Sequence, residues 1–187
     1  RPHLQERNTV MAKTAVLVME MQNDYFWEKR LPKFNYDGET LIPAVNRAID
    51  KFQADGCDII YIAQVFPDTP TNQLVFGFNM EGTEGARLHP ALKTVTPWCF
   101  EKNTADIFQD DRIRAFLSAN GYDRYLLCGV DLCGGILATA KGAAEAGAAV
   151  TVLTDCCGTR FDPRKTAETY AALKACGAVL AESEGTV

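Results

Sequence analysis

A carboxylate, a cation and a glycine-rich turn are the features of this sequence that could do chemistry together. Glu20 and Lys102 each end a short apolar run, and a third apolar run leads into the turn 129–135, which contains Cys133. A carboxylate transfers protons, and a buried cation polarises an oxygen or lowers the pKa of a thiol. A turn that opens a helix offers N–H groups to an anion or a nucleophile. Whether this site uses a thiol depends on where the turn places Cys133.

The elements that would position these groups alternate between strand and helix patterns. The predicted strands are 14–20, 58–64, 98–102, 125–130, 149–154 and 178–181, and the predicted helices are 41–55, 110–119, 134–146 and 163–175. Such alternation indicates an α/β protein with a parallel sheet and helices on both faces. We expect a Rossmann-like three-layer α/β/α sandwich whose mostly parallel sheet has about six strands.

The carboxyl ends of the strands form the edge where ligands bind in sheets of this type. Glu20, Gln64, Lys102, the turn 129–135 and Asp155 all fall at predicted strand ends. The segment 65–97 is predicted to be mostly loop, and loops of this length are usually functional.

Length and composition indicate one globular domain. The chain has 187 residues, and its net charge of −5 gives no electrostatic reason to expect nucleic acid or an anionic membrane as partner. Residues 1–13 are predicted to be an N-terminal extension or a cloning remnant, and 14–187 the domain. No apolar run approaches the length of a membrane span, and the polar residues 1–10 lack the core of a signal peptide. Seven cysteines, an odd number, are typical of a reduced, cytoplasmic protein.

Four separated segments resemble the motifs of one family, and they occur in the same order. They are 20–26, similar to "D-M-Q-N-D-F"; 82–90, similar to "G-T-x-G-A-x-L-H-P"; 102–108, similar to "K-x-x-x-S-A-F"; and 129–147, similar to a strand end Gly-Val that leads to "C-V-x-A-T-A-x-x-A-x-x-x-G". By these motifs the chain is identified as a member of the isochorismatase-like cysteine hydrolase superfamily. The resemblance covers residues 14–181 and implies the α/β fold predicted above.

The resemblance also implies roles for individual residues. Glu20 stands at the position of the catalytic Asp, one methylene longer, and Lys102 at that of the catalytic Lys. If the helix register is kept, Gly135 occupies the position of the nucleophile. If Cys133 is placed there instead, the turn loses two residues. The uninterrupted match along the helix favours Gly135.

Three functions remain open on this basis. In the isochorismatase branch of the family, Gly takes the nucleophile's position and a vinyl ether is cleaved by protonation from the acid. The first hypothesis is therefore an acid-assisted, thiol-independent hydrolase that uses Glu20, Lys102 and Gly135. The second is a cysteine amidohydrolase that uses Cys133 on a small amide. The third is a catalytically silent member with a binding or assembly role.

Five further positions are candidates for substrate binding. Gln64 matches a Gln that contacts the substrate in the isochorismatase branch. Phe26 and Trp98 belong to a group of aromatic residues near the loops, and Gly129 and Asp131 belong to the glycine-rich turn.

The resemblance also bears on metals and partners. The nicotinamidase branch carries "D-x-H-P-x-x-H" after the second strand, whereas the segment 64–68 contains no histidine. We therefore expect no metal and no other cofactor. We expect a small-molecule substrate, no nucleic acid and no membrane as partner, and a homo-oligomer, either a dimer or a tetramer.

Overall fold

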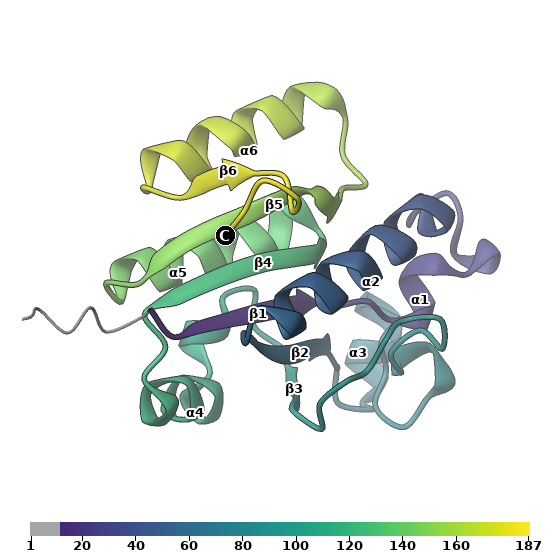
Figure 1. The fold of residues 1–187 in the computed structure, drawn as a ribbon. Helices are drawn as coiled ribbons and strands as arrows, with labels where there is room; N and C mark the ends of the chain where they lie inside the picture. Colours follow the sequence, from purple (N-terminus) through teal and green to yellow (C-terminus); the bar gives the residue numbers. More distant parts are fainter. Residues whose placement is uncertain (1–11) are drawn as a thin grey trace, which may run out of the picture.

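Six strands form the central sheet of the protein in the computed structural model, which describes residues 12–187 (Figure 1). The strands are β1 (Thr14–Met19), β2 (Asp58–Gln64), β3 (Cys99–Lys102), β4 (Arg124–Val130), β5 (Ala149–Gly158) and β6 (Val179–Ala181). Their order in the sheet is β3-β2-β1-β4-β5-β6, and every neighbouring pair is parallel. The predicted sheet is confirmed, and it is parallel throughout.

Four longer helices cover the two faces of this sheet. One face packs against α2 (Gly38–Ala54), and the other against α4 (Asp111–Asn120), α5 (Leu137–Glu145) and α6 (Pro163–Ala175). The predicted three-layer arrangement is therefore confirmed. Since the chain winds outward from the centre in both directions, the strand order reverses between β1 and β4. That point is where ligands bind in open parallel sheets.

Helix ends follow local sequence signals. The carboxylate of Asp110 accepts from the backbone N–H groups of Arg112 and Ile113 at the start of α4, and Gly121 ends that helix with a φ of +68°. Asp162 caps α6 in the same way through the N–H of Lys165. These are the residue types that helix termini favour.

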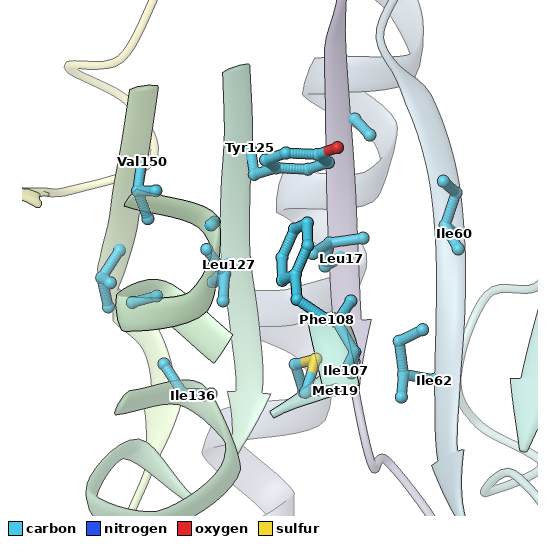
Figure 2. Packing of buried hydrophobic residues seen from close by; sticks show 14 of the residues in the cluster. Leu17, Met19, Ile60, Ile62, Ile107, Phe108, Tyr125, Leu127, Ile136 and Val150 are labelled. Atoms are coloured by element: carbon cyan, nitrogen blue, oxygen red, sulfur yellow. The ribbon is translucent and has the colours of Figure 1, made fainter. Parts of the chain in front are cut away.

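The core is divided by the sheet into two apolar layers. Along β1, Leu17 and Met19 face one layer while Val16 and Val18 face the other, as the period of two in a strand requires. Figure 2 shows the first layer, where Phe108 lies over Leu17. All these strand residues are fully buried, so β1 has no solvent-facing side.

The structure refines the predicted elements. The segment 65–97 is mostly loop, as predicted, and also contains α3 (Pro70–Val75) and a 3-10 turn at Glu84–Ala86. The helix predicted over 134–146 begins only at Leu137, because Leu132–Ile136 forms an irregular turn in which Gly134 departs from helical backbone angles. Strand β5 continues four residues further than predicted.

Shorter elements complete the fold. They are α1 (Asn23–Phe26) and the 3-10 turns Glu28–Arg30 and Ile107–Gln109. Of the predicted extension 1–13, residues 1–11 lie outside the described part of the chain. None of the described helices is both long and apolar enough to cross a membrane.

Gly129 brings β4 unusually close to β1. It pairs with Met19 in the sheet register, and its φ of +108° is one that side chains rarely adopt. A Cβ at this position would lie 2.1 Å from the backbone oxygen of Met19. Gly129 was a candidate for substrate binding, and its placement gives it a backbone role at the junction of the two central strands.

We expect the substitution Gly129→Ala to lower the free energy of unfolding by about 3 kcal/mol or more, because backbone strain and a steric clash add. The matched control is Gly147→Ala, where φ is +86° but a Cβ would meet no atom within 4 Å. The control should lose only about 1–2 kcal/mol, the cost of the left-handed backbone. Urea unfolding of both variants measures the difference, and equal losses would contradict a close approach at Gly129.

Candidate functional site

Glu20, Gln64 and Lys102 meet at the carboxyl ends of β1, β2 and β3. The Nζ of Lys102 lies 3.3 Å from Oε2 of Glu20 and donates a hydrogen bond of 2.9 Å to Oε1 of Gln64. The side chains of Lys102 and Glu20 are only 1% and 8% exposed. Three residues predicted from separate segments therefore form one buried polar group, with an ion pair shielded from water.

Tyr25 supports Glu20 from a second side and was missed by the sequence reasoning. Its hydroxyl donates to Oε1 of Glu20 over 3.1 Å. Burial, followed by the nearby negative charge of Glu20, holds the pKa of Tyr25 well above its ordinary value, so the phenol stays protonated and remains a donor. A signal was present in the motif comparison, because the family segment has Phe where this chain has the hydroxyl-bearing Tyr25.

Gly135 is the residue that faces the ion pair. A Cβ on Gly135 would lie 2.8 Å from Oε2 of Glu20 and 3.7 Å from Nζ of Lys102. The structure thus brings together Glu20, Lys102 and Gly135. This agrees with the motif alignment that keeps the helix register and so puts Gly135 at the nucleophile's position. The extra methylene of Glu20 carries its carboxylate toward the space that a side chain at position 135 would need.

Cys133 belongs to a different cluster, centred on Asp131. The Sγ of Cys133 lies within hydrogen-bond distance of Oγ1 of Thr159, at 3.4 Å, and its backbone N–H donates to Oδ1 of Asp131 over 2.7 Å. No hydrogen bond joins Cys133 to Glu20 or Lys102 within the described residues. Within this part of the chain the thiol therefore bonds Thr159, which follows β5 directly, and not the ion pair.

The carboxylate of Asp131 is saturated by protein donors. It accepts from the backbone N–H groups of Cys133 and Arg160 and from the hydroxyls of Tyr36 and Thr159, at 2.7 to 3.0 Å. Burial and the charge of Asp131 raise the pKa of Tyr36, which keeps that phenol a donor. Asp131 was a candidate for substrate binding, and these contacts give it the task of fixing the glycine-rich turn.

Two buried residues of the segment after β1, Gln22 and Asp24, bond the backbone of segments next to the site. Gln22 bonds both backbone groups of Gln64, accepting from its N–H and donating to its carbonyl, each at 2.8 Å. Asp24 accepts from the backbone N–H of Asn79 at 2.7 Å and pairs with Arg30 at 2.6 Å. Sequence reasoning did not single out either residue, because Gln64 and Asn79 lie 42 and 55 residues away along the chain.

The two aromatic candidates for substrate binding do not meet at the ion pair. Phe26 packs against Tyr36 and against His89, with ring centroids 6.1 and 5.8 Å apart, and lines a cavity of about 750 Å³ beside α2. Trp98 precedes β3 and packs against Phe116 of α4. Because β3 runs from Cys99 to Lys102, Trp98 lies at the end of that strand opposite to the carboxyl edge.

Metal ligands are not grouped in the described part of the chain. Residues 12–187 contain no cluster of three or more His, Cys, Asp or Glu side chains placed to hold an ion. Directly after β2, where the family's metal motif would stand, the chain has Val65, Phe66 and Pro67, which offer no ligating side chain. The residues present there do not fit a metal ion.

Solved structures of several known proteins share this fold. An isochorismatase-like hydrolase from Alkaliphilus metalliredigens matches with a TM-score of 0.80 at 23% identity, over 93% of this chain and 96% of that one. The N-carbamoylsarcosine amidase from Thermoplasma acidophilum gives 0.77 at 21% identity, over 93% and 98%. The pyrazinamidase of Pyrococcus horikoshii, solved in complex with zinc, gives 0.77 at 23% identity, over 91% and 99%.

Sequence comparison extends this likeness from the fold to the family. No curated protein matches the chain. The family model described as the isochorismatase domain does match, over residues 14–185, which is nearly the whole chain. The family expected from the four motifs is thereby confirmed. The protein belongs to the isochorismatase-like hydrolases, a family of enzymes that act on small molecules.

Proposed function

We propose that this protein hydrolyses a small molecule without a cysteine nucleophile, and that Glu20 is the group that transfers the proton. The observation that carries the proposal is the position of Gly135, whose Cβ would lie 2.8 Å from Oε2 of Glu20. A residue facing the acid and the cation thus has no side chain. The acid and the cation remain, and the attacking group must come from water.

The reaction best suited to this arrangement is the hydrolysis of a vinyl ether. Glu20 takes up a proton from solvent and donates it to the terminal carbon of the double bond, which leaves an oxocarbenium ion. Water adds to that ion and returns one proton to Glu20. The resulting hemiketal breaks into a ketone and an alcohol, so one water molecule is consumed and Glu20 is restored.

Lys102 supports this chemistry through its charge. Its Nζ bonds both Glu20 and Gln64, so it orients both side chains, and its charge can attract an anionic group of the substrate. Since Gly135 has no side chain, no Cβ stands at the position 2.8 Å from Oε2 of Glu20. The side chain of Gln64 is the candidate contact for a polar substrate group.

The two other hypotheses have weaker support. A cysteine mechanism requires Cys133 to reach the acid and the cation, whereas its thiol bonds Thr159. The amidase names of the structural neighbours describe those proteins, at identities of 21% and 23%. A silent member would keep the polar group of Glu20 and Lys102 as a structural ion pair, which turnover measurements distinguish from an active site.

We also propose that the protein forms a homo-oligomer and works in the cytoplasm, both of which remain predictions. Helix α3 and the residue after it expose a continuous apolar group, with Leu74, Val75 and Phe76 at 88%, 60% and 37%. Such a group is typical of surfaces that contact another protein, which supports an oligomer.

The function is tested by turnover of a panel of vinyl ethers similar to isochorismate, together with small amides. We expect the wild-type protein to cleave a vinyl ether and Glu20→Gln to lower kcat about 100-fold or more, because proton transfer is lost. Cys133→Ala should remain within about twofold of wild type, since no step involves the thiol. Glu84→Gln is the matched control, because Glu84 is an exposed glutamate paired with Arg87.

Each contrary result has a distinct meaning. Loss of activity in both Glu20→Gln and Cys133→Ala would replace this proposal with the cysteine mechanism. Absence of turnover with every substrate of the panel, in protein whose unfolding transition is intact, would support the silent member.

The fit between Glu20 and Gly135 can be measured separately from activity. We expect Gly135→Ala to lower the free energy of unfolding by about 1–3 kcal/mol, because its Cβ would crowd the carboxylate. Shortening that side chain by Glu20→Asp should relieve the clash, giving a coupling of about 1 kcal/mol in the double-mutant cycle. Gly185→Ala is the control, since its Cβ would meet the backbone oxygen of Glu182 at an ordinary 3.9 Å. Additive losses would show that the two positions do not compete for space.

A further inference from the structure

The cavity beside α2 is separate from the candidate active site. Its volume is about 750 Å³, and Glu20, Lys102 and Gly135 do not line it. Its lining comes from three segments, which are 26–39, 42–50 and 89–93. Pockets that bind small molecules typically measure about 300–1,000 Å³, so the cavity has the size of a second binding site.

Aromatic rings make up much of the cavity wall. Phe26 packs against both Tyr36 and His89, and Phe34 lies nearly parallel to Tyr36, with ring centroids 6.3 Å apart. Burial lowers the pKa of His89, so its imidazole carries no charge at neutral pH. A wall of this kind favours a ligand with an apolar or aromatic body, which it removes from water.

The charged side chains of the wall favour a positive group on that ligand. Four are acidic and two are basic: Glu28, Asp37, Glu39 and Asp50 against Arg47 and Lys93. Lys93 is paired with Asp50, and Asp37 caps the start of α2. The other three form no ion pair with any residue of the range 12–187. The uncompensated charges are therefore two negative and one positive.

One ring of the wall already attracts a cation of the chain. The Nζ of Lys29 lies 4.1 Å from the centroid of the Trp27 ring. Such a contact forms because the face of an aromatic ring is negative. Rings and uncompensated carboxylates on one wall thus suit a molecule that combines an apolar body with a positive charge.

We propose that this cavity is a second binding site, for a small molecule in which an aromatic ring carries an amine. The ring of the ligand lies among Phe26, Phe34 and Tyr36, and its ammonium group lies toward Glu28 and Glu39. A neutral or anionic molecule of the same shape buries the same apolar area but lacks the attraction to the carboxylates. This binding is independent of the reaction that the protein catalyses.

Two residues of the wall connect the cavity to the candidate active site. The hydroxyl of Tyr36 donates to Oδ2 of Asp131 over 2.8 Å, and Asp131 holds the glycine-rich turn. The ring of Phe34 packs against Tyr25, with centroids 4.8 Å apart, and Tyr25 donates to Glu20. A bound amine that displaces either ring would therefore change the surroundings of the carboxylate. Only this effect on activity rests on the proposed function.

The fluorescence of Trp27 tests the binding without any substrate. The chain has two tryptophans, so Trp98→Phe leaves Trp27, on the cavity wall, as the only one. We expect phenethylamine to change this fluorescence in a saturable manner and to bind about tenfold more tightly than hydrocinnamate, an acid of similar size. Phenethyl alcohol, the neutral analogue, should lie between them. The absence of a saturable change with the amine, or equal affinities for the three probes, overturns the proposal.

Variants in the same background locate the probe. Ala91→Phe adds a ring to the cavity wall and should weaken binding of the amine about tenfold or more, because it fills part of the space. Glu39→Gln removes an uncompensated carboxylate and should weaken binding about threefold. The matched control is Glu145→Gln, an exposed glutamate at the end of α5, which should leave the affinity unchanged. Unchanged affinity in both Ala91→Phe and Glu39→Gln would place the probe elsewhere and overturn the proposal.

A second copy of the chain is the competing occupant of the cavity, and sedimentation distinguishes the two. If Ala91→Phe and the amine both dissociate an oligomer of the protein, the cavity is an interface between copies and the proposal is wrong. An unchanged sedimentation coefficient together with saturable binding of the amine supports the proposal.

Turnover of the substrate found in the panel measures the connection between the two sites. We expect saturating phenethylamine to change kcat of the wild type about threefold or more. Tyr36→Phe keeps the ring but removes the bond to Asp131, so it should bind the amine as the wild type does and lose most of this effect. Binding that leaves kcat unchanged refutes the connection.

The second site and the hydrolase proposal fail in different ways. Saturable binding of the amine by a protein with no turnover would refute the hydrolase proposal alone. Turnover that needs Glu20, in a protein that does not bind the amine, would refute the second site alone.

Discussion

The buried ion pair between Glu20 and Lys102 is the interaction around which the edge of this sheet is organised. Two opposite charges removed from water are stable only when hydrogen bonds satisfy their remaining polar atoms. Gln64 accepts from the cation, and Tyr25 donates to the acid. Gln22 in turn fixes the backbone of Gln64. The segments that follow β1, β2 and β3 are therefore tied together by the need to compensate these two charges.

The same pair explains why positions 20 and 135 depart from the family's motif together. A glutamate extends one methylene further than an aspartate, and its Oε2 reaches within 2.8 Å of the place where a side chain at position 135 would begin. A longer acid and an absent side chain are thus complementary in volume. This relation links two sequence differences that lie more than 100 residues apart.

The conformation of the turn 129–135 is held by contacts that do not require a thiol nucleophile. On one side, the four donors to Asp131 hold the turn together with Tyr36, Thr159 and Arg160. Cys133 contributes its backbone N–H to this cluster, and its thiol is occupied by Thr159. On the other side, Gly129 allows β4 to approach β1 closely. These contacts hold the turn in which Gly135 faces the ion pair.

The sequence by itself determined the α/β class, the strands and most helix positions, because apolar periodicity and capping residues are local signals. It also determined the family and the residues Glu20, Gln64 and Lys102, since each ends a buried strand. Only the tertiary structure decided which residue of the turn faces the acid, because that depends on the irregular backbone around Gly134. It likewise placed Trp98 away from the ion pair and revealed the hydrogen bond from Tyr25 to Glu20. These are long-range packing relations, and no local pattern encodes the partner that a buried polar side chain meets or lacks.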